Sequence, residues 1–221
     1  MSTEGKPRRA KARDGLLIIG LVGRAGSGKT TVARALAEDG ARLIEADRLG
    51  HEVTDRDPEV RKALAAEYGP GIYRENGELD RPRVAARIFS DREARARLDA
   101  LVHPRIVERI RHELDTLRAA GARGVAVIDA ALMLEWGLER DCDAVIAVVA
   151  PEAAQIERLW RARGLSESEA RARLAAQRTN EAFAAAADVT LVNQGSAEEL
   201  RRQARAALAS LEAESTKGTG C

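Results

Sequence analysis

The chain has 221 residues and carries 36 Lys and Arg against 35 Asp and Glu, a formal net charge of +1. This balance argues against broad binding to nucleic acid or to an anionic membrane, and an aromatic content of 3% leaves few platforms for stacking single-stranded bases. The two cysteines, Cys142 and Cys221, suggest neither a metal site nor a disulfide framework, and no apolar run approaches 18 residues. We therefore expect one cytoplasmic domain with one or two insertions and no membrane or nucleic-acid partner.

Basic residues crowd the N-terminal segment, in the run Lys6-Pro7-Arg8-Arg9-Ala10-Lys11-Ala12-Arg13. Such a run is either a solvated tail or a basic binding arm, and we interpret residues 1–14 as a disordered tail. Residues 213–221 are interpreted as a second disordered tail. The folded part is therefore expected to be one domain over residues 15–212.

The apolar run Leu16–Val22 opens directly into a G-x-x-x-x-G-K-T pattern. Its residues are Gly23, Arg24, Ala25, Gly26, Ser27, Gly28, Lys29 and Thr30. A buried strand, this loop and a following helix over 30–38 together predict a phosphate-binding P-loop. Its backbone N–H groups would cradle the phosphates of a nucleoside triphosphate, Lys29 would reach the β- and γ-phosphates, and the Thr30 hydroxyl would hold Mg²⁺.

Five short apolar runs are predicted to be buried parallel strands, because helical patterns lie between them. They are Leu16–Val22, Ala41–Glu45, Gly124–Ile128, Ala144–Val149 and Val189–Val192. Roughly 80 residues separate the second and third strands, too many for one crossover helix. The predicted fold class is therefore α/β, with a P-loop NTPase core around a five-stranded parallel sheet. The core would comprise residues 15–47, 120–157 and 188–212, with a helical insertion at 48–119 and an Arg-rich segment at 158–187.

Four segments of the insertion show helical periodicity. They are Asp57–Tyr68, Arg81–Ser90, Asp91–Val102 and Arg105–Ala119. Pro104 is expected in the first turn of the last helix, where its missing N–H costs nothing. His103 would then lie at a helix junction, where a lone histidine is structural more often than functional.

Acidic residues follow two of the predicted strands. Asp47 stands just past the second strand, where ligands of an open α/β sheet lie. It is either a helix N-cap or a base for an attacking hydroxyl, and we favour the catalytic or substrate-orienting role. Asp129 ends the run 125–128 and resembles a Walker B acid that helps to place Mg²⁺, with capping as the alternative. Glu135 is a separate polar candidate at the same crevice.

Arginines open the second inserted segment at Arg158, Arg161 and Arg163. A planar guanidinium grips phosphate oxygens in pairs, so a closing segment that carries Arg can neutralise a transferring phosphoryl group. Any single one of them can instead belong to a solvated helix face. We expect at least one of the three to reach the nucleotide.

The ordered set of motifs resembles the dephospho-coenzyme A kinase family from about Leu17 to Leu208. The motifs that carry the resemblance are the P-loop, Glu45-Ala46-Asp47, Tyr68-Gly69, Gly77-Glu78-Leu79-Asp80-Arg81, Phe89-Ser90-Asp91, His103-Pro104-Arg105-Ile106, Leu132-Met133-Leu134-Glu135, Ala176-Gln177, Ala187-Asp188 and Asn193. The resemblance implies ATP-dependent, Mg²⁺-requiring phosphorylation of the ribose 3′-hydroxyl of dephospho-coenzyme A. It also implies that 48–119 binds the coenzyme A moiety and that 158–187 is a lid over ATP.

The resemblance assigns roles to individual residues. Catalytic roles would fall to Asp47, Lys29, Arg161 and Arg163. ATP would be bound by Gly23, Ala25, Gly26, Ser27, Gly28, Lys29, Thr30, Arg158 and Asn193. The acceptor would be bound by Asp47, Arg81, His103, Arg105 and Glu135, and Mg²⁺ by Thr30 and Asp129. The expected partner is this small-molecule substrate, bound by a monomer or weak homo-oligomer.

The chain departs from the family pattern at several positions. Arg24 replaces the usual second glycine of the loop, which is tolerable if its side chain points outward. Arg161 and Arg163 bracket the position of a single lid arginine. Two alternatives stay open: a related P-loop kinase for a nucleoside monophosphate or small polyol, and a non-catalytic nucleotide switch. The absence of an Asn-Lys-x-Asp motif opposes the switch.

Overall fold

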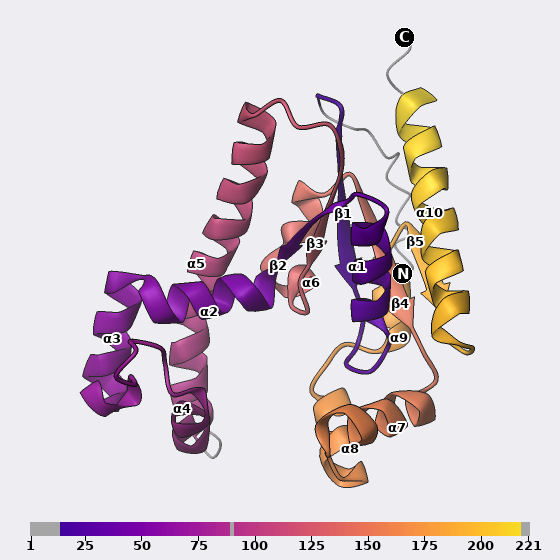
Figure 1. The fold of residues 1–221 in the computed structure, drawn as a ribbon. Coiled ribbons are helices and arrows are strands. Elements are labelled where there is room, and N and C mark those ends of the chain that lie inside the picture. Colours follow the sequence, from indigo (N-terminus) through magenta and orange to yellow (C-terminus); the bar gives the residue numbers. More distant parts are fainter. Residues whose placement is uncertain (1–13, 89–90, 218–221) are drawn as a thin grey trace, which may run out of the picture. The chain divides into compact units, whose positions relative to one another are not determined.

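The computed structural model describes residues 14–88 and 91–217 (Figure 1). The chain divides into two compact units. One combines the residues up to Ile44 with those from Leu117 onward, and the other is Glu45–Thr116. The second unit lies within three residues of the predicted insertion at 48–119. Phe89, Ser90, residues 1–13 of the predicted basic tail and residues 218–221 lie outside the described residues.

A five-stranded sheet organises the first unit, with strand order β2-β3-β1-β4-β5. The strands are β1 (Leu16–Val22), β2 (Arg42–Glu45), β3 (Gly124–Asp129), β4 (Ala144–Val149) and β5 (Val189–Val192). β1 pairs in parallel with β3 and β4, and β4 with β5. All seven residues of β1 are buried, as expected for a central strand covered on both faces. The predicted parallel α/β sheet is confirmed, with β2 starting and β3 ending one residue later than expected.

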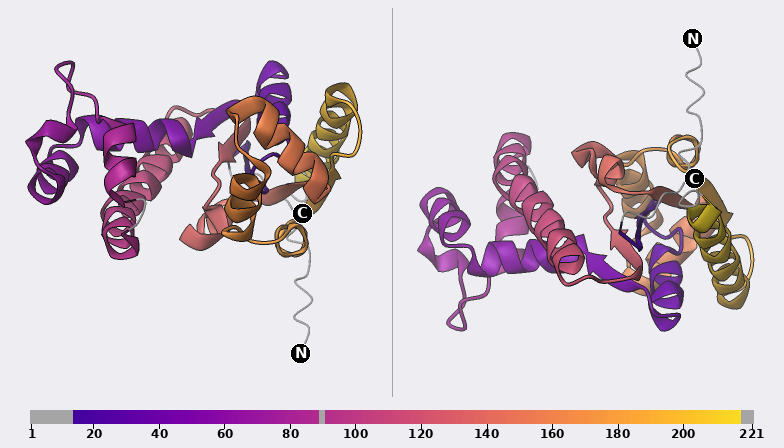
Figure 2. Two further views of the ribbon diagram at one scale, coloured as in Figure 1. Left: turned by 90° about the horizontal axis from the view of Figure 1, so that it is seen from below. Right: turned by 90° about the horizontal axis from the view of Figure 1, so that it is seen from above.

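Six α-helices and one 3₁₀ turn accompany this sheet in the part of the chain that the structure describes. They are α1 (Lys29–Glu38), α6 (Met133–Trp136), the 3₁₀ turn η2 (Leu138–Asp141), α7 (Glu152–Arg163), α8 (Glu167–Ala175), α9 (Asn180–Ala185) and α10 (Ala197–Lys217). α1 and α10 lie side by side on one face, as both views of Figure 2 show. Their apolar side chains join those of β1, β3 and β4 in one buried cluster. α9 packs on β4 and η2 on β1.

α10 corrects one sequence expectation. The helix continues to Lys217, so residues 213–217 are helical and do not belong to a disordered tail. Ser215 is only 5% exposed, which shows that this end of the helix is packed against the unit. Within the described residues, no helix is both long enough and apolar enough to cross a membrane.

The second unit is helical. Its elements are α2 (Ala46–Arg56), α3 (Pro58–Tyr68), the 3₁₀ turn η1 (Pro70–Ile72), α4 (Arg81–Ile88) and most of α5 (Arg92–Ala119). Asp57 caps α3, because its carboxylate accepts from the N–H groups of Glu59 at 3.0 Å and Val60 at 3.2 Å. One stripe of α5 is buried, at Val102, Ile106, Ile110 and Leu114. Gly50 of α2 allows close packing here, since a Cβ would lie 3.2 Å from Ile106 Cδ1.

α5 also corrects the predicted helix junction. Residues 92–119 form one continuous helix with Pro104 inside it, so no helix begins after His103. The reason is the apolar stripe, which recurs every four residues across the proline and is buried along its length. Packing therefore outweighs the backbone hydrogen bond that an interior proline removes.

We predict that Pro104→Ala stabilises the second unit. Alanine restores an N–H donor in the helix interior and removes the clash of the ring, so the free energy of unfolding should rise by about 1–3 kcal/mol. Urea denaturation measures the change. Pro58→Ala is the matched control, because Pro58 lies in the first turn of α3, where proline costs little. Equal shifts in the two variants would contradict this account of α5.

Candidate active site

The loop between β1 and α1 has the geometry of an anion cradle. Gly28 precedes α1 with φ 104°, and no side chain caps the helix. The Thr31 N–H donates to the Gly28 carbonyl at 2.9 Å, and the start of the helix carries a partial positive charge. A Cβ on Gly28 would lie 2.4 Å from Asn193 Nδ2, and one on Gly23 would lie 2.4 Å from the Val148 carbonyl. Only glycine therefore fits these two corners of the loop.

Lys29 and Asp129 meet beside this loop. Lys29 Nζ donates to Asp129 Oδ1, and the two side chains are only 17% and 15% exposed. Asp129 is the last residue of β3, so the carboxyl end of that strand delivers the acid to the loop. Thr30, in the first turn of α1, is exposed. Lys29, Asp129 and Thr30 thus all lie at one edge of the sheet.

Several polar atoms around the loop are buried without a partner. Among the described residues, Ser27 Oγ, Arg24 Nε and both amide atoms of Gln155 have no hydrogen bond. Ser27 and Gln155 are completely buried. Burial of unpaired polar atoms is costly, so these groups fit a loop that binds a polar ligand.

Arg158 and Asn193 hold the loop from outside. Arg158 Nη1 donates to the Gly26 carbonyl at 3.0 Å, and Asn193 Nδ2 donates to the Ser27 carbonyl at 2.8 Å. Arg158 Nη2 also lies 3.5 Å from the Asn193 carbonyl. The structure thus brings two predicted ATP ligands to the loop. Both side chains stabilise the loop backbone through these bonds.

Arg161 and Arg163 lie in the last turn of α7, and both are exposed. Arg161 pairs with Glu157 at 2.7 Å on the same helix. Since α7 begins at Glu152, Arg158 lies in the middle of a helix that starts before the predicted lid boundary. A role for Arg161 or Arg163 at the phosphates stays a prediction.

Arg24 is the largest departure from the sequence-based expectation. Its side chain does not point outward, because the residue is only 8% exposed. Nη2 donates to the Leu174 carbonyl at 2.6 Å, and Nη1 lies 3.5 Å from Glu152. Next to it, the Ala25 N–H donates to Gln177 Oε1 at 2.9 Å. These contacts join residues 128 to 152 positions apart, and no local sequence signal predicts them.

Glu135 engages an arginine that the sequence analysis did not single out. Arg178 Nε donates to Glu135 Oε1 at 2.7 Å, between α6 and the segment after α8. Both side chains remain more than one third exposed. The pair is therefore open to exchange its partners for a ligand, but a role in acceptor binding stays a prediction.

In the helical unit, Arg81 is held by its own neighbours. Arg81 Nη2 donates to Asp55 Oδ2 and to Thr54 Oγ1, both at 3.0 Å. Burial alone would raise the pKa of Asp55, but hydrogen bonds from the Leu79 N–H and from Arg81 outweigh it and hold that pKa below its usual value. The Arg81 side chain is 34% exposed.

Two further candidates lie on α5. Burial lowers the pKa of the His103 imidazole and Arg95 adds to the effect, although Asp99, 3.4 Å from Nε2, opposes it. His103 is therefore neutral near pH 7. Arg105 pairs with Glu59 of α3 and, at 3.3 Å, with Glu108. Binding of an acceptor by His103 or Arg105 stays a prediction.

Asp47 lies in the first turn of α2. The N-cap of this helix is Glu45, with no side-chain cap, so the N-cap alternative for Asp47 is wrong. Asp47 is exposed and free of the capping geometry that holds Asp57. Its proposed catalytic role thus stays a prediction.

A parallel sheet with this strand order, this glycine-rich loop and its Lys–Asp pair define the core of a P-loop kinase. Comparison with known proteins is more specific. The dephospho-CoA kinase family model matches residues 17–199. The chain therefore belongs to the dephospho-CoA kinase family.

Individual relatives agree with this placement. A dephospho-CoA kinase of Moorella thermoacetica is 40% identical over 192 residues, covering 87% of this chain and 91% of the relative. One of Streptomyces avermitilis is 41% identical over 188 residues, covering 85% and 90%. A Thermus thermophilus crystal structure superposes with a TM-score of 0.71 at 33% identity, covering 88% and 97%. A Campylobacter jejuni dephospho-CoA kinase at 21% identity shares the fold, with a TM-score of 0.63 and coverage of 89% and 97%.

We predict a pH-dependent contribution of Asp55 to stability. Because its pKa is lower in the folded protein, the unfolded chain binds more protons, and the contribution is present above the unfolded value and lost as pH falls. Asp55→Asn should cost about 1–3 kcal/mol at pH 7, and the difference from wild type should shrink below about pH 4. Urea titrations at several pH values measure both. Glu75→Gln, at an exposed acid of the same unit, is the control. A difference that is constant with pH would refute this assignment.

Proposed function

We propose that the protein transfers the γ-phosphoryl group of ATP to the ribose 3′-hydroxyl of dephospho-coenzyme A, giving coenzyme A and ADP. The observation that carries the proposal is the Lys29–Asp129 pair at an uncapped helix N-terminus, in a chain of this family. Phosphoryl transfer depends chiefly on positioning and on stabilising negative charge. A loop that offers backbone N–H groups and a lysine meets both needs.

The phosphates of ATP would bind along residues 23–30. Lys29 is already close to Asp129, so ATP binding exchanges an acid partner for phosphate oxygens. The Thr30 hydroxyl and the Asp129 carboxylate are oxygen donors of the kind that Mg²⁺ prefers, and Mg²⁺ usually takes only one or two protein ligands beside phosphates. When bound, Mg²⁺ neutralises charge that develops on the β- and γ-phosphates.

The acceptor hydroxyl would meet Asp47 as its base. An ionised carboxylate can accept the hydroxyl proton. Arg81, His103, Arg105 and Glu135 are the residues that we propose for acceptor binding. Arg158, Arg161 and Arg163 are those that we propose for the lid over ATP. A cytoplasmic location and a monomeric or weakly associating state belong to the same proposal.

A direct assay tests the reaction. The purified protein is incubated with ATP and Mg²⁺ and with dephospho-coenzyme A, adenosine monophosphate or no acceptor, and products are separated by chromatography. We expect coenzyme A only with the first acceptor. Lys29→Ala is the inactive control, since it removes a charge used in binding and in transfer. Phosphate on a different acceptor, or ATP consumption without any acceptor, would overturn the proposal.

We predict that Asp47→Asn lowers kcat by roughly 10²–10⁴-fold, the usual span for a positioned base. The lower end is expected, because a loose phosphoryl-transfer transition state asks little of its base. The affinity for ATP should stay within a few-fold, since Asp47 is assigned to the acceptor. Kinetics, nucleotide titration and thermal melting are measured on the same preparation.

Asp57→Asn is the matched control for Asp47→Asn. It makes the same chemical change at a helix start of the same unit, at a residue that caps α3. Asparagine also caps well, so this variant should keep wild-type kcat. An unchanged kcat in Asp47→Asn, or a loss that follows unfolding, would remove Asp47 from the mechanism.

A further inference from the structure

Arg24 joins the phosphate-binding loop to both helices of the adjacent α7–α8 pair. Its Nη2 donates to the carbonyl of Leu174 in α8 at 2.6 Å, and its Nη1 lies 3.5 Å from Glu152 in the first turn of α7. The bond to Leu174 is buried, whereas Glu152 is half exposed. A buried charge-assisted bond is the stronger of the two, so we take the end of α8 as the main partner of Arg24.

The end of α8 suits a cation. Leu174 lies in the last turn of the helix, where carbonyl groups lack helical partners and carry partial negative charge. The Gln177 N–H also donates to the Leu174 carbonyl at 3.1 Å, so Arg24 adds a charged donor to a carbonyl at the helix end. The Arg24 guanidinium thus caps the C-terminus of α8 by donating to a carbonyl of its last turn.

A second bond runs between the same two segments. The Ala25 N–H donates to Gln177 Oε1 at 2.9 Å, one residue along the loop and three residues beyond Leu174. Two adjacent loop residues therefore hold the stretch 174–177. This arrangement fixes the direction of the chain as it leaves α8, in addition to its distance from the loop.

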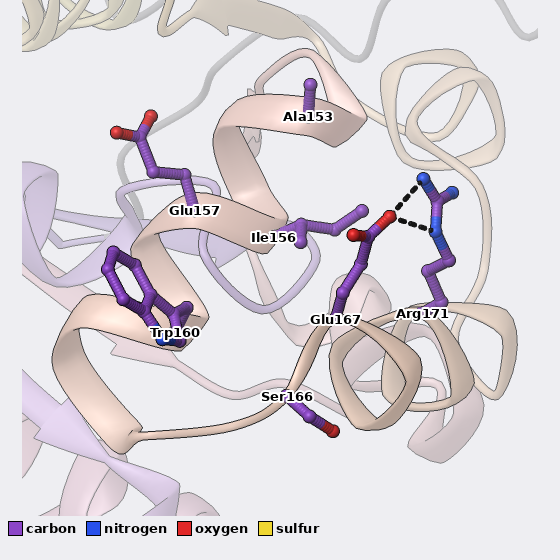
Figure 3. Close-up of a pocket in the computed structure, with 7 residues that line it drawn as sticks. All are labelled: Ala153, Ile156, Glu157, Trp160, Ser166, Glu167 and Arg171. Carbon is purple, nitrogen blue, oxygen red and sulfur yellow. Dashed lines mark hydrogen bonds and ion pairs between the residues drawn. The ribbon is translucent and has the colours of Figure 1, made fainter.

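Charge pairs extend this attachment through the helix pair. Glu152 also contacts Arg171 at 3.2 Å, and Arg171 binds Glu167 at 2.9 Å, the pair drawn with dashed lines in Figure 3. α7 and α8 enclose a groove of about 490 Å³, lined in part by Ile156 and by Trp160, which is 59% exposed. The pairs around Arg171 are exposed and individually weak. The pairs form a chain from Arg24 through Glu152 and Arg171 to Glu167, and Arg24 is the member that lies in the phosphate-binding loop.

We propose that Arg24 is a positioning residue that seats the α7–α8 pair on the phosphate-binding loop before ATP arrives. The inference rests on the proposed function for its kinetic readout. If the α7–α8 pair is held on the loop before ATP binds, most molecules are already in the conformation that binds ATP. When that state becomes rarer, the apparent dissociation constant rises by the same factor. Saturating ATP restores the seated state, so the rate at saturation changes little.

The test compares Arg24→Met with wild type. Methionine keeps the buried stem and removes both guanidinium contacts. We expect the KM for ATP and the calorimetric Kd for ATP to rise about tenfold, the scale of one bond to a charged group, while kcat stays within about threefold. Hydrogen exchange of backbone amides in 170–178 should accelerate in the ATP-free variant. Arg24→Lys keeps one donor group and should recover part of each effect.

Arg34→Ala is the matched control, because it removes an exposed guanidinium from α1 and should leave all readouts unchanged. Lower thermal stability with unchanged ATP affinity and unchanged exchange would make Arg24 merely structural and overturn the proposal. A fall in kcat at constant KM, or tighter ATP binding, would overturn it as well. If Arg24→Met does not fold, the same measurements on Arg24→Lys decide. Affinity and exchange are readable without turnover, so failure of the proposed reaction remains distinguishable.

Discussion

The structure depends on an open helix N-terminus held at the end of a buried strand. β1 is covered on both faces, so its carboxyl end is fixed, and Gly28 turns the chain into α1 in a left-handed conformation. No side chain satisfies the first N–H groups of α1. The helix N-terminus therefore keeps a partial positive charge that suits an anionic ligand. The position of Lys29 beside Asp129 and the placement of the segments around the loop both depend on this helix N-terminus.

Segments far apart in the sequence hold the loop in that conformation. Arg158 and Asn193 bind carbonyl groups of the loop, whereas Arg24 and Ala25 donate outward to the end of α8. The carbonyl groups of Gly26 and Ser27 are thereby already hydrogen-bonded. Orientation of backbone dipoles before ligand binding is an effective way to stabilise transferred charge, because no reorganisation is then required.

In the helical unit, residues proposed to bind the acceptor are held by ion pairs. Arg81 pairs with Asp55, and Arg105 pairs with Glu59. Such pairs hold long side chains in defined positions, and the side chains of Arg81 and Arg105 stay about one third exposed. An anionic acceptor would have to compete with these carboxylates, so discrimination can arise from the strength of each pair. Hydrogen bonds from the Leu79 N–H and from Arg81 hold the pKa of Asp55 below its usual value.

The sequence by itself determined the strands, the loop and the family, because buried parallel strands are continuous apolar runs and the P-loop is a contiguous motif. It also placed Asp129 at a strand end. Local rules failed at Pro104, where a buried stripe carries one helix through a residue that ordinarily ends helices. They failed again at Arg24, whose partners are Glu152 and the Leu174 carbonyl. Those outcomes needed the tertiary structure, since packing and long-range hydrogen bonds depend on what the fold brings together and not on neighbouring residues.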